Sequence, residues 1–153
     1  MHENLKICLA VSAGGHATQL LKLKDVWESA ECFSITTSPA VKEQLARFGP
    51  VYVVPEANRR RPIKAIRVLT RCMKIVCSEQ PDVVISTGAA VGCIAGIVGR
   101  LTGARIVWVD SIANVERLSL SAYLAKPFAD LVLTQWPEVA DKYKSVEYVG
   151  RVV

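Results

Sequence analysis

Metal-binding patterns are missing from this chain. Its 153 residues include only two histidines, and its five cysteines are scattered without any C-x-x-C pair, at Cys8, Cys32, Cys72, Cys77 and Cys93. Zinc is normally held by closely spaced cysteines and histidines, and an odd set of scattered cysteines does not form such a pattern. We therefore predict no metal site and interpret the cysteines as reduced core residues of a cytosolic protein.

The two common nucleotide-binding loops are also missing. The chain has no P-loop, because G-x-x-x-x-G-K-[ST] does not occur in it. A dinucleotide fingerprint needs G-x-G-x-x-G after the first strand and an acidic residue at the end of the next strand, but that next strand ends in Thr36-Thr37-Ser38. The sequence therefore argues against an NAD site, and we expect no cofactor.

Long apolar runs and a leader segment are absent as well. The longest uncharged stretch, residues 83–99, is shorter than a membrane span and is interrupted by Ser86-Thr87-Gly88. The N-terminus runs directly into the first predicted strand, which leaves no room for a signal peptide. With 51% hydrophobic residues, the chain is long enough for one well-packed core. We expect one domain over residues 1–153, neither secreted nor membrane-spanning.

One segment lacks acidic residues altogether. Between residues 59 and 74 the chain has no acid and seven cations: Arg59, Arg60, Arg61, Lys64, Arg67, Arg71 and Lys74. Elsewhere acidic residues outnumber basic ones, so the net charge of +5 is a local feature.

This basic segment predicts an amphipathic helix over residues 63–79. Four of the cations recur at steps of three and four residues, beside an apolar stripe formed by Ile66, Leu69, Met73 and Val76. A solvated surface is the ordinary interpretation, but cations without acidic partners favour an anionic ligand. An anionic membrane surface fits, since each basic residue near it contributes on the order of 1 kcal/mol. Nucleic acid is disfavoured because the segment has no aromatic residues for stacking.

Strand and helix patterns alternate along the chain. Strands are predicted at residues 5–11, 32–37, 51–54, 83–86, 105–109, 131–134 and 147–149. Helices are predicted at residues 17–29, 40–48, 63–79, 89–101, 119–128 and 137–143. This alternation predicts an α/β fold with a parallel sheet and helices on both faces. In such sheets the ligand crevice lies outside the carboxyl ends of the strands.

The first such carboxyl end carries Ser12-Ala13-Gly14-Gly15-His16, between an apolar run and a helical pattern. The glycines bring a ligand close to the backbone, the first N–H groups of the helix lack partners, and His16 offers a titratable ring. This is a phosphate-handling geometry. The alternative is a turn that needs glycine only for its backbone angles.

The fourth strand ends in a similar loop of small residues, Ser86-Thr87-Gly88-Ala89-Ala90-Val91-Gly92. Its backbone N–H groups make it a second candidate for anion binding. The small residues continue along the helix at steps of about four, which we interpret as close packing of the helix on the sheet.

Two further positions carry chemistry after the fifth and sixth strands. Asp110 ends a buried strand, where a carboxylate can accept a proton or serve as an N-cap for the following helix; Asn114 lies just beyond it. Trp136 precedes a proline that starts a helix, and it belongs either to the core or to a partner surface.

In this order the motifs resemble the acceptor-binding subunits of split glycosyltransferases. The resemblance rests on Ser12 to His16, on Ser86 to Gly92, and on Asp110-Ser111-Ile112 followed by residues 118–121 and 129–138, and it covers nearly the whole chain. The family includes PssD-type exopolysaccharide and capsule proteins and the membrane-recruiting subunit of the dolichol-linked N-acetylglucosaminyltransferase. The N-terminal half of MurG is a more distant relative.

The resemblance implies one Rossmann-like half of a GT-B enzyme, with the nucleotide-sugar site on a partner chain in a heterodimer. It implies an inverting UDP-sugar transferase that elongates a polyprenyl-pyrophosphate-linked saccharide on the inner face of the cytoplasmic membrane. His16 is then the first candidate base and Asp110 the second, although relatives often have Glu in place of Asp110. The acceptor and its phosphates would be bound by Gly14, Gly15, Thr18, Thr87, Gly88, Ala89 and Asn114.

The chain also departs from the eukaryotic subunit, because it shows no N-terminal membrane helix; attachment would then rest on the basic helix. Two other functions stay open at this point. One is a stand-alone Rossmann-like enzyme that uses another nucleotide. The other is a noncatalytic membrane adaptor that recruits a catalytic subunit through Trp136 and the small-residue helix.

Overall fold

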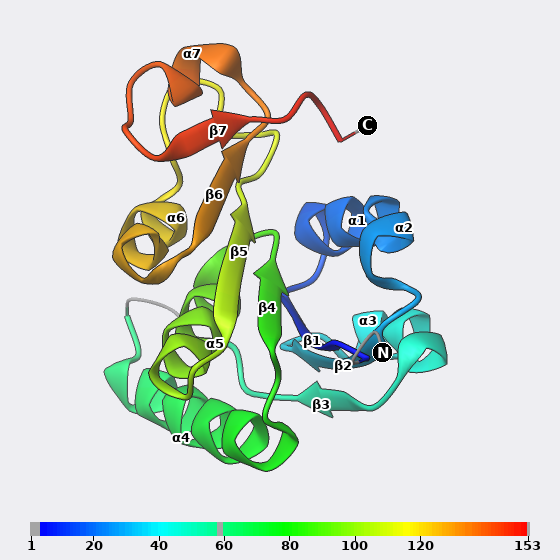
Figure 1. The fold of residues 1–153 in the computed structure, drawn as a ribbon. Coiled ribbons are helices and arrows are strands. Elements are labelled where there is room, and N and C mark those ends of the chain that lie inside the picture. The colour runs from blue at the N-terminus through cyan, green and yellow to red at the C-terminus, as the bar shows by residue number, and fades with distance from the viewer. Residues whose placement is uncertain (1–3, 58–59, 153) are drawn as a thin grey trace.

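A computed structural model describes residues 4–57 and 60–152. A seven-stranded sheet runs through the molecule in the order β3-β2-β1-β4-β5-β6-β7, and every neighbouring pair is parallel (Figure 1). The strands are β1 (Lys6–Val11), β2 (Glu31–Thr36), β3 (Val51–Val53), β4 (Val83–Ser86), β5 (Arg105–Val109), β6 (Leu131–Thr134) and β7 (Val146–Tyr148). The predicted strands and the α/β class are confirmed, and each strand boundary lies within one residue of its prediction.

Helices connect the strands, as the alternation predicted. They are α1 (Gly15–Lys22), α2 (Lys24–Trp27), α3 (Pro39–Leu45), α4 (Pro62–Glu79), α5 (Ala89–Leu101), α6 (Leu120–Ala125) and α7 (Pro137–Ala140). The helix predicted at residues 17–29 is divided at Leu23, whose N–H bonds to Leu20 and Leu21 carbonyls close α1. Two predicted helices end as 3-10 turns, η1 (Ala46–Phe48) and η2 (Lys126–Phe128).

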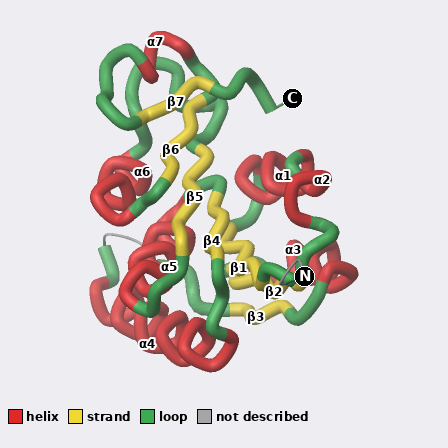
Figure 2. Tube along the Cα trace, in the orientation of Figure 1, coloured by secondary structure: helices red, strands yellow, loops and turns green. Residues whose placement is uncertain are grey.

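Helices cover both faces of the sheet (Figure 2). Side chains alternate along β1, so Cys8 and Ala10 pack with α4 and α5, whereas Leu9 and Val11 pack with α1 to α3. A third cluster around Trp108 joins α5, α6 and α7 to the strands from β5 onward. Because β1 is covered on both sides, its sequence from Ile7 to Val11 is apolar rather than alternating.

The glycines of α5 let this helix lie close to the sheet, as predicted. A Cβ at Gly92 would lie 1.9 Å from Ser86 Oγ, and one at Gly99 would lie 2.6 Å from Val84 Cγ2. No side chain fits at these distances. The small residues therefore set the depth at which α5 packs on β4.

Helix α4 is amphipathic as predicted, but it buries a second apolar stripe against the core. Its buried residues are Val68, Cys72 and Val76. Of the apolar stripe that the sequence showed, only Val76 is buried, since Ile66, Leu69 and Met73 are 63%, 41% and 49% exposed. Two apolar stripes run side by side on this helix, and the sheet and α5 contact the one with the smaller side chains.

The cations of α4 lie beside its exposed apolar stripe. Lys64, Arg67, Arg71 and Lys74 are all exposed, as are Arg60 and Arg61 just before the helix, while Arg59 lies outside the described residues. Cys77 is also exposed, which corrects the interpretation of all five cysteines as core residues. Within residues 4–57 and 60–152, none of the helices has the length and apolarity needed to cross a membrane.

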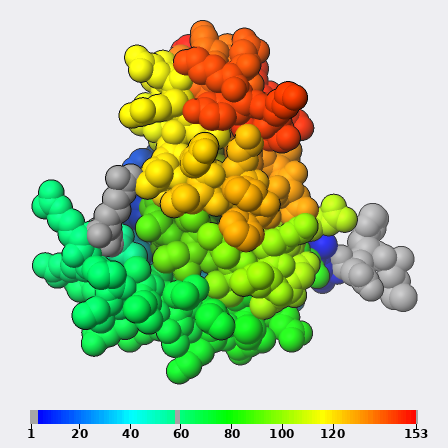
Figure 3. Space-filling view, turned by 90° about the vertical axis from the view of Figure 1, so that its left-hand side faces the viewer, coloured from blue at the N-terminus to red at the C-terminus, as the bar shows by residue number. Residues whose placement is uncertain are grey.

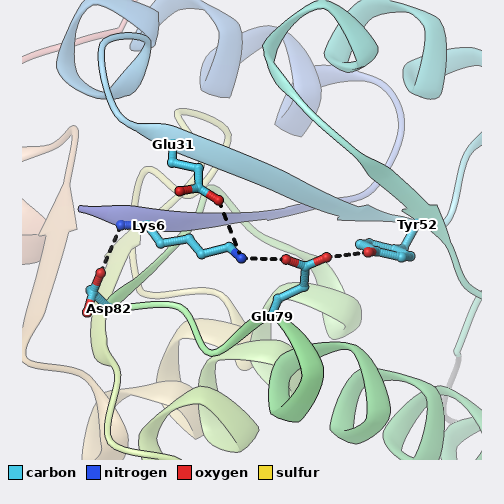
Figure 4. Close-up of polar contacts among 5 residues, drawn as sticks. All are labelled: Lys6, Glu31, Tyr52, Glu79 and Asp82. Carbon is cyan, nitrogen blue, oxygen red and sulfur yellow. Dashed lines mark hydrogen bonds and ion pairs between the residues drawn. The ribbon is translucent and has the colours of Figure 1, made fainter. Parts of the chain in front are cut away.

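A charged network fastens α4 to the amino end of the sheet (Figure 4). Lys6 Nζ lies 2.7 Å from Glu79 Oε2 and 3.5 Å from Glu31 Oε1, and the Tyr52 hydroxyl donates to Glu79. Asp82 accepts the backbone N–H of Lys6 at 2.8 Å. The hydrogen bond from Lys6 lowers the pKa of Glu79, and the same contact raises the pKa of Lys6.

Candidate functional site

The strand order reverses between β1 and β4, and the loops that leave these two strands meet at their carboxyl ends. β1 and β4 are neighbours in the sheet, whereas the chain from β1 continues to β2 on the other side. Such a switch point is the ordinary place for a ligand crevice in an open parallel sheet. The structure therefore brings together the two loops that the sequence singled out.

His16 and Thr87 join these two loops by two hydrogen bonds. His16 Nδ1 lies 3.0 Å from the carbonyl oxygen of Thr87, and the Thr87 hydroxyl donates to the carbonyl oxygen of His16 at 2.6 Å. His16 is half-buried and Thr87 is fully buried. The imidazole is thereby fixed against the β4 loop.

A groove of about 640 Å³ begins at His16 and runs between α4, α5 and α6. Figure 3 shows the face of the molecule on which α4 and α6 lie with α5 between them. The groove wall is mainly apolar, with three serine hydroxyls and one amide. It is formed by His16, Ala57, Ala65, Ala89, Ala90, Cys93, Ile94, Ser111, Ala113, Asn114, Ser119, Leu120, Ser121 and Leu124.

Charge is scarce in this groove. Among the described residues that line it, only His16 and Cys93 are titratable, and burial raises the pKa of the Cys93 thiol. A neutral, apolar wall beside one imidazole suits a ligand with an apolar part and a polar part at the His16 end.

The Ser12 to His16 loop exposes its glycines beside the groove. Gly14 and Gly15 are exposed, and Gly14 adopts a positive φ of 74° where the chain turns into α1. No acidic residue lies in the first turn of α1, whose leading N–H groups are available for an anion. Thr18 is exposed one turn on, with its hydroxyl 3.3 Å from the Gly14 carbonyl.

We expected the β4 loop to bind the acceptor, but most of this loop is buried. Thr87 and Gly88 are buried behind the His16 ring, and the Gly88 N–H donates to Ser86 Oγ at 3.2 Å. A Cβ on Gly88 would lie 2.3 Å from His16 Nδ1. Of the three residues predicted to bind acceptor here, only Ala89 lines the groove.

Asp110 is buried beneath the loops rather than exposed in the groove. It is 1% exposed, and its carboxylate accepts from the Ser119 hydroxyl at 2.7 Å, the Ser119 N–H at 2.9 Å and the Trp108 indole at 3.3 Å. Ser119 in turn caps α6 by accepting the Ala122 N–H. Asp110 therefore acts through the cap residue of α6, and it does not reach the groove as a base would.

Two buried glutamines tie the loops together, and sequence reasoning missed the role of Gln19. Gln135 donates to Gln19 at 2.6 Å and to the Asp110 carbonyl at 3.0 Å, and Gln19 accepts the Ile112 N–H at 3.2 Å. Gln135 also accepts the N–H of Val152 at 2.7 Å. The available signal was an amide at position 19, beside Ala17 and Leu20 on the buried face of α1.

Trp136 and Asn114 stand near the rim of the site. The Trp136 indole donates to the Ile112 carbonyl at 2.7 Å, and the Arg151 guanidinium lies 4.3 Å from the centre of the ring. Trp136 packs against the cluster around Trp108, so much of the ring belongs to the core. Asn114 lines the groove.

Curated proteins from yeasts resemble this chain over most of its length. The UDP-N-acetylglucosamine transferase subunit ALG14 of Yarrowia lipolytica is 28% identical over 184 residues, covering 99% of this chain and 83% of that protein. The protein of the same name from Schizosaccharomyces pombe is 32% identical over 122 residues, covering 74% of this chain and 58% of that protein.

Solved structures share the fold at low sequence identity. MurG of Acinetobacter baumannii has a TM-score of 0.78 at 16% identity, covering 95% of this chain and 45% of that chain. The MnaA–UDP structure from S. aureus has a TM-score of 0.69 at 16% identity, covering 97% of this chain and 45% of that chain. The chain thus spans a little less than half the length of these proteins, which confirms the expected Rossmann-like half of a GT-B architecture.

A family profile completes the comparison. Residues 53–152 match the family described as "Oligosaccharide biosynthesis protein Alg14 like". The matched segment includes the basic helix α4, the β4 loop, Asp110 and the Trp136 region, and it is well over half of the chain. The chain therefore belongs to the Alg14-like family.

Proposed function

We propose that this chain is the acceptor-binding subunit of an inverting UDP-sugar glycosyltransferase. It binds a polyprenyl-pyrophosphate-linked saccharide at the inner face of the cytoplasmic membrane, while a partner chain binds the nucleotide sugar. The observation that carries the proposal is the placement of His16 at the head of an apolar groove, at the switch point of one GT-B half. The names of the Alg14 relatives support a transferase subunit, with UDP-N-acetylglucosamine as the first donor to test.

The proposed reaction requires this chain to accept one proton. An acceptor hydroxyl attacks the anomeric carbon of the donor sugar, the new glycosidic bond forms, and the bond to UDP breaks with inversion. The hydroxyl proton passes to His16, whose neutral imidazole can accept it. Asp110 is not retained as the base, because its oxygens are buried against Trp108 and Ser119.

The acceptor's two chemical parts match the two parts of the site. Its pyrophosphate would lie at the N-terminus of α1, on the backbone of Gly14 and Gly15 and beside Thr18. Its apolar chain would follow the groove past Ala89, with Asn114 near the saccharide. Glycines exposed beside a largely uncharged groove support this arrangement.

Helix α4 provides the proposed membrane contact. Beyond Ile66, Leu69 and Met73, Ile63 is 70% exposed, so the outward face combines an apolar stripe with the cations Lys64, Arg67, Arg71 and Lys74. Apolar residues with flanking cations are the pattern of helices that lie in a membrane interface. Helix α6 lies on the same face of the molecule as α4 (Figure 3). Residues 120–128, which include α6 and η2, carry the exposed apolar residues Leu120, Tyr123, Leu124 and Phe128, of which Leu120 and Leu124 line the groove.

The central experiment compares the wild-type chain with His16→Ala, each reconstituted with its co-purified partner. Transfer from UDP-N-acetylglucosamine to a synthetic polyprenyl-pyrophosphate saccharide should fall about 100- to 10,000-fold, the usual contribution of a general base. Complex formation should be unchanged. Undiminished transfer with His16→Ala would favour the noncatalytic adaptor instead.

The division of labour has its own test. Calorimetric titration of the isolated chain with UDP-N-acetylglucosamine should show weak binding or none, because the donor site is assigned to the partner. Tight binding to the isolated chain would contradict a split enzyme and favour a stand-alone nucleotide enzyme.

The membrane contact is tested with vesicles. Wild type should sediment with vesicles that contain anionic lipid, and the quadruple variant Lys64→Gln, Arg67→Gln, Arg71→Gln, Lys74→Gln should not, since each cation contributes about 1 kcal/mol. A matched control replaces four exposed cations on α1 to η1, on the other side of the sheet: Lys22, Lys24, Lys42 and Arg47. Equal release of both variants would remove the membrane role from α4.

The biosynthetic pathway is the most specific part of the proposal. The sequence resemblance to PssD-type proteins supports exopolysaccharide or capsule synthesis as the setting. Loss of such a polymer on deletion, with restoration by wild type and not by His16→Ala, is the expected result. An unchanged polymer would place the chain in another glycan pathway.

A further inference from the structure

The contact between His16 and the β4 loop determines which imidazole nitrogen carries a proton. A carbonyl oxygen only accepts hydrogen bonds, so the 3.0 Å contact between Nδ1 and the Thr87 carbonyl requires a hydrogen on Nδ1. The partner of one ring nitrogen fixes the state of the other. The neutral imidazole is then protonated at Nδ1 and carries its lone pair at Nε2.

Three features hold the ring in this position. The Thr87 hydroxyl donates to the His16 carbonyl at 2.6 Å, so each residue bonds to the backbone of the other. Gly88 leaves room for the ring, because a Cβ there would lie 2.3 Å from Nδ1 and 2.4 Å from Cε1. The backbone is shaped to match, with φ at +143° for Gly88 and +69° for Ala89.

We propose that Thr87 and Gly88 are positioning residues that lock His16 in the Nδ1-protonated tautomer and so assign Nε2 as the atom that takes the acceptor proton. This inference rests on the proposed function for its catalytic meaning. Its structural part, the tautomer, stands on the loop contacts alone. It also gives the burial of Thr87 and Gly88 a purpose other than binding the acceptor.

The tautomer can be read directly, because the chain has only two histidines. A His2→Gln variant of the full chain leaves His16 as the single imidazole in a long-range proton–nitrogen NMR spectrum. In the locked neutral ring, Nδ1 should have the chemical shift of a protonated nitrogen and Nε2 that of an unprotonated nitrogen. A neutral ring protonated at Nε2, or an even mixture of tautomers, overturns the proposal.

Gly88→Ala should break the lock, because its methyl group occupies the place of the ring. Gly103→Ala is the matched control: Gly103 also has a positive φ, +97°, but nothing lies within 4 Å of its Cβ position. We expect the Nδ1-protonated signature to be lost in Gly88→Ala and kept in Gly103→Ala. Its persistence in Gly88→Ala would overturn the role of Gly88.

Thr87 is tested by a conservative pair of variants. Thr87→Val removes the hydroxyl while keeping the backbone carbonyl, and Thr87→Ser restores the hydroxyl. We expect a mixed tautomer signal in Thr87→Val and the wild-type signal in Thr87→Ser. Identical spectra in both variants would remove Thr87 from the lock.

Transfer activity then separates the lock from the proposed function. In the reconstituted pair, Gly88→Ala should lose about tenfold or more in turnover, a share of the usual contribution of a positioned base, while Gly103→Ala changes less than about twofold. Full turnover in Gly88→Ala with its tautomer lost would overturn the positioning role. If His16→Ala keeps full turnover while the chain with His16 intact shows the Nδ1-protonated tautomer, the base assigned under the proposed function is refuted. The lock would still stand in that case.

Discussion

The two ends of the sheet are built from opposite kinds of polar interaction. At the amino end, Lys6, Glu31, Glu79 and Asp82 form a network of charges, and the Lys6 side chain is 25% exposed against 62% for Glu31 (Figure 4). At the carboxyl end, buried amides, hydroxyls and one carboxylate replace them, and Gln135 and Thr87 are fully buried.

The amino end of the sheet attaches a helix, whereas the carboxyl end holds the groups of the site in fixed positions. Partly exposed charges are screened by water and give little stability, so the amino end can only tie α4 to the strands. Buried neutral hydrogen bonds are costly to break, because each leaves a polar group without a partner. The end of the sheet that carries the proposed chemistry is therefore the one whose groups are held most firmly.

Removing Asp110 should give the largest loss at the carboxyl end. Asp110→Ala leaves the Trp108 indole and the Ser119 N–H without their acceptor, which should lower the free energy of unfolding by about 3 kcal/mol. Urea denaturation measures the change. Asp141→Ala, at an exposed aspartate, should change stability by less than about 0.5 kcal/mol. A similarly small effect at Asp110 would show that its contacts contribute little.

Gly92→Ala should come next, because it forces α5 away from β4. The new methyl group would lie 1.9 Å from Ser86 Oγ and 2.9 Å from Ser86 Cβ, and overpacking of this kind costs about 2 kcal/mol. Gly96→Ala is the control within the same helix: its Cβ meets only Ile106 Cγ2 at 3.3 Å, and alanine improves helix propensity. Thermal unfolding of the two variants should differ clearly, and equal midpoints would refute the close packing.

Most of the fold followed from the sequence because parallel strands buried on both faces leave a strong apolar signal. Runs such as Val83-Val84-Ile85 and Ile106-Val107-Trp108 marked their strands to within a residue. The glycine spacing in α5 also predicted close packing correctly, since small residues at steps of about four have few other structural uses in a helix on a sheet.

The candidate site was only partly predictable. Sequence position placed His16 and the β4 loop at one edge of the sheet, but it did not show that Thr87 and Gly88 lie behind the ring. That depends on how two loops more than seventy residues apart in sequence pack together, as the contact between His16 and Thr87 shows. Asp110 was equally ambiguous, because a carboxylate after a strand serves a cap or a base with the same spacing.

Helix α4 shows where periodicity fails. Ile66, Leu69 and Met73 and the buried set Val68, Cys72 and Val76 have nearly the same spacing, so neither pattern alone identifies the core face. The space between α4 and the sheet determines which stripe is buried, because the smaller side chains fill it. The larger ones remain outside beside the cations.

This choice of face is directly testable at neighbouring turns of α4. Val76→Ala removes two methyl groups from a fully buried position and should cost about 2 kcal/mol. Met73→Ala removes a larger side chain that is 49% exposed and should cost less than about 0.5 kcal/mol. Chemical denaturation decides between the stripes, and a larger loss for Met73→Ala would show that the stripe of Ile66, Leu69 and Met73 contributes more to packing.

The smallest effect should come from the charged network at the amino end, and its sign depends on pH. Glu79→Gln should destabilise the chain by only about 1 kcal/mol at neutral pH, because the ion pair that it removes is partly exposed.

The pKa of Glu79 is lowered in the folded chain by Lys6 and then Tyr52. The contribution of Glu79 to stability is therefore complete above its ordinary pKa of 4.5 and disappears as the pH falls through the lower folded value. The pKa values of Lys6 and Tyr52 are raised by hydrogen bonds with Glu79, so their contributions are complete below 10.5 and 10.0 and disappear at higher pH. The stability difference between wild type and Glu79→Gln should therefore be greatest between about pH 5 and pH 9 and shrink on both sides. Urea denaturation across this range measures it, and a difference that is independent of pH would mean that Glu79 contributes packing rather than charge.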